Sequence, residues 1–233
     1  MKLLRKFKMY GLKRSLYFTV IELYRLLFSR LCRGSYAQNG EDIVIDRILN
    51  RKDKVSYVDV GANEACRFSN TMRFYKRGGR GINIEPNSDL FDRLKKMRSR
   101  DINLHMGVSD RKGTLTFYRF FPHTVSTFSA LQAEEYKRQG FRFIGDERVE
   151  VDTLSQVIER YFEGKTPDFF SIDTEGFNME VLRGNDWGRY SPTVICIENS
   201  EDGKDREFLL SRGYEMVCDN GINSIYRKKR NGA

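Results

Sequence analysis

Short runs of β-forming residues alternate with helical patterns through most of this chain, and this alternation limits its fold more than any other feature. The β-forming runs are residues 55–60, 81–84, 102–106, 168–172 and 194–197. Amphipathic helical patterns occupy residues 69–77, 90–97, 154–161 and 179–183, and another ends before Gly213. Apolar strands joined by helices form parallel sheets that are covered on both faces. The sequence therefore predicts a doubly wound α/β fold.

Residues 111–150 do not fit a simple helical crossover between two of these strands. Residues 113–118 predict an extra strand, a Ser/Thr-rich loop with His123 follows, and residues 131–139 form a helical pattern. Insertions of this length that lie over strand ends often carry binding sites or lids. We therefore expect this segment to cover a site.

The basic charge is concentrated at the two ends of the chain. The formal net charge is +9, but residues 1–33 alone hold nine Lys or Arg against Glu22, a net of +8. Residues 227–230 add +4, which leaves the residues between these segments at −3. Such a distribution argues against a basic groove, so we expect no nucleic-acid partner.

Residues 15–33 form an amphipathic pattern outside the domain predicted for residues 34–233. Glu22 and Arg25 interrupt its apolar face well before the roughly 18 residues that span a membrane. Two roles remain open for this predicted helix. It packs on its own domain, or it binds an anionic membrane surface peripherally, where each basic residue contributes about 1 kcal/mol.

The cysteines give no sign of an oxidised scaffold or a cysteine zinc site. The chain has four, Cys32, Cys66, Cys196 and Cys218, and no Cys-x-x-Cys spacing. Such usage is typical of a reducing compartment, so we expect a cytoplasmic protein.

The turn after the first predicted strand has the residues of a cofactor-binding turn. Gly61 permits a tight turn and close backbone approach, and Asp59 offers an acceptor beside it. Ala62 and Asn63 complete the turn. The Gly-x-Gly-x-x-Gly pattern of dinucleotide-binding proteins is absent, which argues against NAD and favours S-adenosylmethionine, a cofactor without a pyrophosphate.

Acidic residues also end two further predicted strands. Glu85, followed by Pro86, comes 24 residues after Gly61, and a carboxylate there can accept both ribose hydroxyls of an adenosine. Asp173 and Glu175 follow the strand at 168–172. Ligands of open parallel sheets bind outside the carboxyl ends of the strands, so these residues are candidates for one site.

Five motifs in this order resemble the FkbM family of S-adenosylmethionine-dependent methyltransferases. They are YAQNGED at 36–42, VDVGAN at 58–63, INIEPN at 82–87, GVSD at 107–110 and FFSIDTEG at 169–176. The resemblance covers residues 35–226 and implies a class I methyltransferase fold. That fold has a mostly parallel seven-stranded sheet, whose last hairpin would be residues 214–218 and 223–227. Members are typically O-methyltransferases that act on sugar hydroxyls of surface glycans or on natural products.

The resemblance also implies roles on the adenosine side of the cofactor. Glu85 would bind the ribose, and Gly107, Val108 and Asp110 would flank the adenine.

On the methionine side, the resemblance implies contacts from Asp59, Gly61 and Asn63, with Asp173 near the methyl group. One position departs from the family pattern, because Ala65 stands where members often have glycine.

An alcohol acceptor must lose a proton, so a general base should lie within hydrogen-bond reach of it. The candidates are Asp173, Glu175 and His123. Asp173 and Glu175, with Glu198 and Asn199, also offer oxygen ligands for a magnesium-type cation. We predict that no metal is needed.

The function that these residues favour is S-adenosylmethionine-dependent O-methylation of a small-molecule or glycan acceptor. Two alternatives remain open from the sequence. One is an NAD-linked sugar-modifying enzyme on a similar sheet, and the other is an inactive methyltransferase-like adaptor at a membrane surface.

Overall fold

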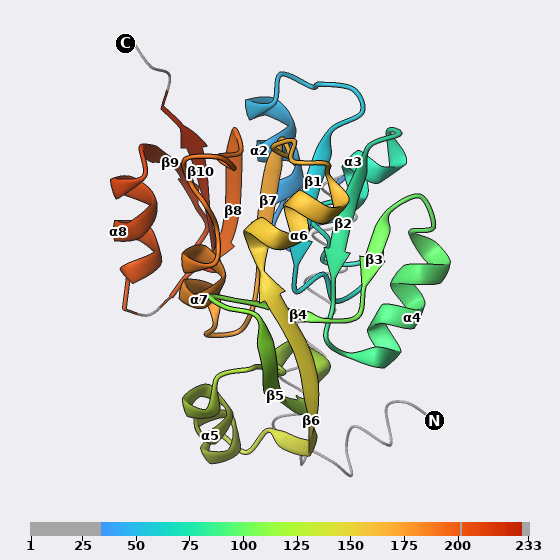
Figure 1. Ribbon diagram of the computed structural model, residues 1–233, viewed down its shortest axis with the longest axis vertical. Coiled ribbons are helices and arrows are strands. Elements are labelled where there is room, and N and C mark those ends of the chain that lie inside the picture. The colour runs from blue at the N-terminus through green and yellow to red at the C-terminus, as the bar shows by residue number, and fades with distance from the viewer. Residues whose placement is uncertain (1–33, 201, 230–233) are drawn as a thin grey trace.

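The computed structural model describes residues 34–200 and 202–229, and a seven-stranded sheet lies at its centre (Figure 1). The strand order is β3-β2-β1-β7-β8-β10-β9. The strands are β1 (Ser56–Val60), β2 (Arg80–Ile84), β3 (Ile102–Leu104), β7 (Phe169–Ile172), β8 (Val194–Glu198), β9 (Tyr214–Asp219) and β10 (Asn223–Lys228). Strand β10 pairs antiparallel with both β8 and β9, whereas the other neighbouring strands described in this sheet pair in parallel. The predicted doubly wound, mostly parallel sheet is therefore confirmed.

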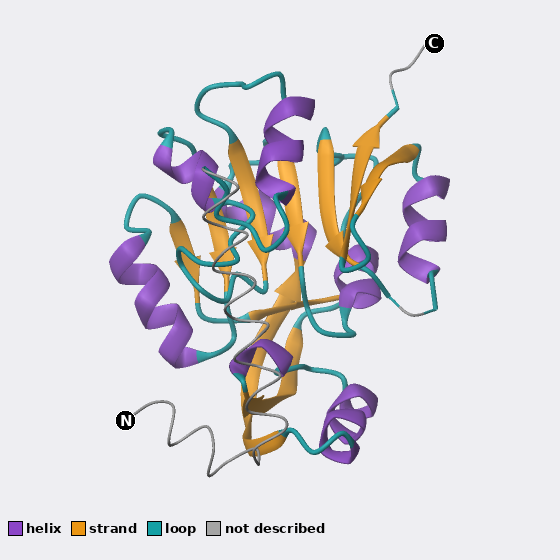
Figure 2. Ribbon diagram, turned by 180° about the vertical axis from the view of Figure 1, so that it is seen from behind, coloured by secondary structure: helices purple, strands orange, loops and turns teal. Residues whose placement is uncertain are grey.

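Helices cover both faces of this sheet, as the two opposite views show (Figures 1 and 2). Successive side chains of a strand point to opposite faces. Val58, Ile82 and Phe170 accordingly pack in the core beneath α6, α7 and α8, whereas Tyr57 and Phe169 pack beneath α2 and α3. The helix bounds are α2 (Glu41–Ile48), α3 (Met72–Lys76), α4 (Ser88–Met97), α6 (Leu154–Tyr161), α7 (Asn178–Arg183) and α8 (Lys204–Ser211).

Helix α2 was not predicted, and α3 is shorter than predicted. Residues 69–71, predicted as the start of α3, instead form a turn in which the Ser69 hydroxyl accepts the Met72 N–H at 3.1 Å. A serine side chain that binds the backbone in this way competes with the first helical turn.

The insertion forms a second, three-stranded sheet with the order β4-β6-β5. It comprises β4 (Gly107–Ser109), β5 (Gly113–Phe121), the 3-10 helix η1 (His123–Val125), α5 (Ala130–Arg138) and β6 (Arg142–Thr153). The predicted extra strand and helix are present, but β6 was not predicted. The first half of β6 shows no regular alternation of apolar and polar residues. The sequence pattern therefore did not indicate a strand that pairs with β5.

The predicted N-terminal amphipathic helix lies outside the described residues. Within the described part of the chain, no helix combines the length and apolar character needed to cross a membrane.

The parallel register aligns the carboxyl ends of four strands. Val60 pairs with Ile84 and with Ile172, and Ile172 pairs with Ile197. The residues that follow these strands therefore meet along one edge of the sheet, over which the insertion lies (Figure 1).

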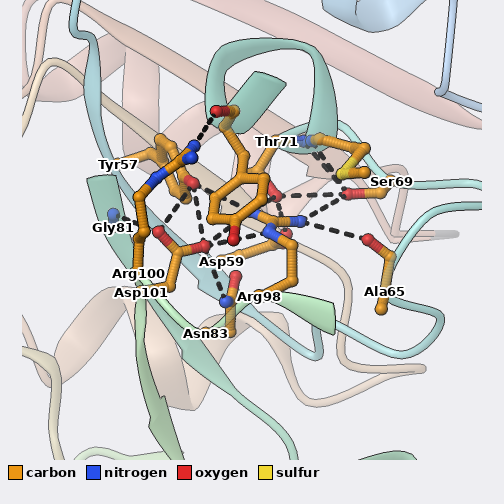
Figure 3. A network of polar contacts seen from close by, with 12 residues as sticks. Tyr57, Asp59, Ala65, Ser69, Thr71, Gly81, Asn83, Arg98, Arg100 and Asp101 are labelled. Carbon is orange, nitrogen blue, oxygen red and sulfur yellow. Dashed lines mark hydrogen bonds and ion pairs between the residues drawn. The ribbon is translucent and has the colours of Figure 1, made fainter. Parts of the chain in front are cut away.

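A buried ion pair joins the end of α4 to the sheet (Figure 3). The side chains of Arg98 and Asp101 are 1% and 0% exposed, and their Nη2 and Oδ2 atoms are 2.8 Å apart. Arg98 also donates to the Tyr57 hydroxyl at 2.8 Å, the Thr71 hydroxyl at 3.1 Å and the Ala65 carbonyl at 3.2 Å. The guanidinium thus connects β1 with the loop between β1 and α3.

The Asp101 carboxylate makes the complementary connections. It accepts the Tyr57 hydroxyl, the Gly81 N–H at 2.9 Å and the Asn83 amide at 3.0 Å. These contacts fix β2 relative to the end of α4. Because both charges are buried, their hydrogen bonds offset a desolvation cost of several kcal/mol per ion.

We expect Arg98→Met to lower the free energy of unfolding by roughly 3–5 kcal/mol, because it leaves the Asp101 carboxylate buried and unpaired. Arg93→Met is the matched control, since the Arg93 side chain lies on the same helix and is 58% exposed. Urea denaturation of both variants makes the comparison. An equal, small loss in both would contradict the importance of the Arg98 network.

Candidate active site

A cavity lies at the aligned strand ends, between the main sheet and the insertion. Eleven residues that the sequence analysis singled out line it: Asp59, Gly61, Ala62, Asn63, Glu85, Pro86, Gly107, Val108, His123, Asp173 and Glu175. The tertiary structure therefore brings together residues separated by more than 100 positions. Asp110 does not line this cavity; its carboxylate accepts the Ser109 hydroxyl at 3.3 Å and lies 3.8 Å from the Arg111 guanidinium.

The turn after β1 requires glycine at position 61. Gly61 has a φ of +77°, and a Cβ there would lie 1.9 Å from the Asp173 carbonyl oxygen. The N–H groups of Gly61 and Ala62 both donate to the Ile84 carbonyl, at 3.0 and 3.1 Å. The turn therefore packs directly on the backbone that follows β7, which leaves the cavity wall without a side chain at this point.

Glu85 forms a rigid carboxylate in the cavity wall. Its two oxygens accept the backbone N–H groups of Asn63 and Asn87, both at 2.8 Å. Burial raises the pKa of Glu85 to about 7, although these two N–H groups favour the ionised form. Each oxygen keeps a further lone pair, so the group can accept hydrogen bonds from a vicinal diol.

Asp59 connects the cavity to the buried network of Arg98. The Thr71 hydroxyl donates to Asp59 Oδ2 at 2.6 Å and itself accepts from Arg98 (Figure 3). Burial raises the pKa of Asp59, while Thr71 and the Arg98 charge oppose that change. Neither Thr71 nor Arg98 belongs to a cofactor motif in the sequence, so their part in the site becomes visible only in the fold.

Three carboxylates cluster where β7 and β8 end. Oxygen atoms of Asp173, Glu175 and Glu198 all lie within 4.8 Å of one another. The pKa of each is raised, first by restricted hydration and then by the neighbouring negative charges. Asp173 opens onto the cavity, yet surrounding protein atoms still limit its hydration. The cluster can therefore hold and accept protons near neutral pH.

Residues of the insertion hold Glu175 of this acidic cluster in place. The Tyr136 hydroxyl from α5 donates to Glu175 Oε2, and the Thr127 hydroxyl donates to the Glu175 carbonyl at 2.7 Å. Glu198 Oε2 accepts the Glu175 N–H at 3.1 Å. Glu175 has a φ of +50°, a left-handed conformation that non-glycine residues adopt mainly where surrounding contacts enforce it.

The same three carboxylates are spaced so that they could surround a divalent cation. The sequence indicated Glu198 only as a possible cation ligand, whereas the fold places its carboxylate beside those of Asp173 and Glu175. The expectation that no metal is needed stays a prediction.

His123 lies in the cavity wall on η1, apart from the acidic cluster. Its Nε2 atom is 3.3 Å from Glu64 Oε1. Burial lowers the pKa of His123, and the Glu64 charge opposes this only in part. The imidazole is therefore oriented by Glu64 rather than by Asp173 or Glu175.

The insertion contributes an aromatic wall that was not predicted. Phe117 and Phe128 have ring centroids 4.9 Å apart and line the cavity together with Met106. Gly107 leaves space for this wall, because a Cβ there would lie 2.6 Å from the Phe128 ring. A flat, apolar group can pack here beside Val108.

A second cavity adjoins the first. It lies between α5, α7 and the segment after β8, and Glu175 lines both cavities. Gln132, Glu198 and Arg183 contribute polar groups to the second one. A molecule that occupies it can therefore reach the acidic cluster.

The order of the seven strands, with one antiparallel strand beside β8 and a ligand cavity at the carboxyl ends, defines the fold of class I methyltransferases. The chain belongs to the methyltransferase FkbM domain family, whose sequence model matches residues 59–216. The resemblance found in the sequence motifs is thus confirmed, and the chain is a methyltransferase by family.

Individual relatives are more distant. The hexuronic acid methyltransferase AglP of Haloferax volcanii is 28% identical over 186 residues, which cover 74% of this chain and 68% of AglP. A crystal structure of methyltransferase FkbM from Methylobacillus flagellatus KT is 16% identical, with a TM-score of 0.49 over 75% of this chain. This chain spans only 44% of that protein. Precorrin-6y C5,15-methyltransferase from Geobacter metallireducens GS-15 is also 16% identical, with a TM-score of 0.45 over 81% of this chain and 87% of that one.

The acidic cluster makes the stability of the folded chain depend on pH. A carboxyl group whose pKa is raised in the folded state contributes stability below its unfolded pKa, and this contribution is lost as the pH rises. Burial and the charges of Asp173 and Glu175 raise the pKa of Glu198. We therefore expect Glu198→Gln to increase the free energy of unfolding relative to the unchanged chain at pH 8.

Urea denaturation at pH 4 and pH 8 measures this difference, which should shrink at the lower pH. Glu150→Gln, at an exposed position of β6, serves as the control and should show no such pH dependence. A Glu198→Gln variant that is less stable than the unchanged chain at pH 8 would show that the cluster is stabilising when ionised.

Proposed function

We propose that this protein transfers a methyl group from S-adenosylmethionine to a hydroxyl of a sugar, in a glycan or a related small molecule. The observation that carries the proposal is the cavity that Glu85, the Gly61 turn and two members of the acidic cluster, Asp173 and Glu175, line together. Membership of the FkbM domain family supports methyl transfer, and the relative named hexuronic acid methyltransferase supports a sugar acceptor.

The residues around the cavity fit this cofactor. Asn63 Oδ1 is buried and has no hydrogen-bond partner among the described residues, although it lies in the cavity wall. A buried acceptor of this kind usually has a partner, and a donor of the cofactor's methionine part would supply one. Glu85 would accept the ribose hydroxyls, and the aromatic wall of Phe117 and Phe128 would pack against the adenine.

When bound, S-adenosylmethionine supplies a methyl carbon that its positively charged sulfur already activates. The protein then has to align the acceptor oxygen with that carbon, and alignment of this kind can lower a barrier by roughly 7–11 kcal/mol. Asp173 would accept the proton of the acceptor hydroxyl, because its carboxylate opens onto the cavity. Burial and the negative charge of Asp59 raise the pKa of Asp173, which favours its role as a proton acceptor.

We further propose a cytoplasmic location, with residues 1–33 as a peripheral membrane contact. The concentration of basic residues in that segment supports this role.

Calorimetric titration with S-adenosylhomocysteine tests the cofactor assignment. We expect binding of S-adenosylhomocysteine and not of NAD, with at least tenfold weaker binding in Glu85→Ala because two hydroxyl contacts are lost. The ionised form of Glu85 is the better acceptor and its pKa is about 7. Affinity should therefore fall when the pH is lowered from 8 to 6.

Asp92→Asn, an exposed acid on α4, is the matched control and should leave the affinity unchanged. Binding of NAD alone would favour the alternative of an NAD-linked enzyme, and binding of neither ligand would favour an inactive adaptor.

Asp173→Asn tests the proposed base. The amide keeps the size of the side chain but cannot accept the acceptor proton. We expect the affinity for S-adenosylhomocysteine to change by less than tenfold, while methyl transfer falls by at least 100-fold. Radiolabelled methyl transfer to a glycan acceptor measures the rate. Equal losses of binding and rate would contradict a catalytic role for Asp173.

A further inference from the structure

The second cavity contains a cation without a counter-ion. Arg183, the last residue of α7, lines this cavity with its side chain open to solvent and has no ion-pair or hydrogen-bond partner among the described residues. Lys204 also lines it, but the Lys204 ammonium lies 2.7 Å from the Asp202 carboxylate. Of these two cations, only Arg183 is therefore available to a bound molecule.

The position of Arg183 relates it to the reacting groups. Glu175 lines the second cavity as well as the first, and Glu198 of the acidic cluster lines the second. A small molecule in the second cavity can therefore reach Arg183 with one part and the acidic cluster with another. An unpaired guanidinium in a concave site selects for a carboxylate or phosphate, which it can bind through two parallel hydrogen bonds.

The remaining polar groups of the second cavity suit hydroxyls. Gln132 and Tyr136 of α5 supply an amide and a phenol, and Glu180, three residues before Arg183 on α7, supplies a carboxylate that can accept from a hydroxyl. The Asp202 charge is compensated by Lys204. Burial and mutual repulsion raise the pKa values of Glu175 and Glu198, so these groups oppose an anionic ligand less than ionised carboxylates would.

We propose that the acceptor is an acidic sugar, a hexuronic acid residue, whose carboxylate binds Arg183 while a ring hydroxyl lies beside Asp173 and Glu175. This assignment rests on the proposed function and specifies its acceptor. The hydroxyl oxygen forms a bond to the methyl carbon, the carbon–sulfur bond breaks with its electron pair remaining on sulfur, and the hydroxyl proton passes to Asp173. The products are a methyl ether and S-adenosylhomocysteine.

Matched sugar probes test the role of Arg183 in the full chain. The acidic probes are the methyl glycosides of glucuronic and galacturonic acid, and the neutral probes are those of glucose and galactose. Each acidic probe differs from its neutral counterpart only in carrying a carboxylate in place of a hydroxymethyl group. We expect the unchanged chain to methylate at least one acidic probe with a kcat/KM at least tenfold above that of its neutral counterpart.

Arg183→Gln should lower kcat/KM for the acidic probe by 10- to 100-fold, mainly through KM, and remove the preference over the neutral probe. Arg183→Lys should restore part of it. Arg47→Gln is the matched control, because Arg47 is an exposed cation in the last turn of α2 and lines neither cavity. Titration with S-adenosylhomocysteine should give the same affinity in all of these variants.

A neutral probe methylated as well as its acidic counterpart, or an Arg183→Gln variant that keeps the preference, would overturn the assignment of Arg183. So would a protein that binds S-adenosylhomocysteine but methylates none of the four probes. Methyl transfer to neutral probes would leave the proposed function intact, whereas failure to bind S-adenosylhomocysteine would overturn that function itself.

Discussion

The buried ion pair between Arg98 and Asp101 is the constraint on which the walls of the cavity depend. Its two charges have almost no exposed surface, so every donor and acceptor around them must be satisfied by the protein. The guanidinium reaches the Ala65 carbonyl and the Thr71 hydroxyl, and Thr71 donates to Asp59. One interaction thus holds β1, the end of α4 and the loop over the cavity in a single arrangement.

The chemistry of the site comes from a parallel sheet that directs several strand ends to one edge. Glu85, Asp173 and Glu198 each follow or end a strand whose neighbours are in register. Burial raises the pKa values of Asp173 and Glu198, and nearby carboxylates add to this, Asp59 for Asp173 and Asp173 with Glu175 for Glu198. In contrast, Glu85 is stabilised by two backbone N–H groups and lies on the opposite side of Gly61 from the acidic cluster. The proposed ribose-binding role and the proposed proton-accepting role therefore fall to carboxylates in different surroundings.

The insertion turns this edge into an enclosed site. Phe117 of β5 and Phe128 of the following loop line the first cavity. Tyr136 of α5 lines the second. The hydrogen bond from Tyr136 to Glu175 connects the two cavities at the acidic cluster. The common scaffold of the class therefore forms the proposed cofactor side, and the insertion together with α7 forms the proposed acceptor side, where Arg183 lies.

Local sequence determined much of the fold and the cofactor side of the site. Apolar runs predicted strands β1, β2, β3, β7 and β8 of the main sheet, whereas the last hairpin was expected only from the family resemblance. A glycine in the β1 turn with an acid 24 residues later predicted the positions of Gly61 and Glu85 in one cavity. These features could be predicted from the sequence because an apolar run, a tight turn and an acid at a strand end each involve only a few consecutive residues. Tertiary structure alone decided the rest. Arg98 donates to Tyr57, which is 41 residues away in the sequence, and β6 is a strand because it pairs with β5. Arg183 and Glu175 line the same cavity only because the fold brings α5, α7 and the end of β8 together. Partners so far apart in the chain leave no pattern in either local segment, since burial and charge compensation arise only when the chain has folded.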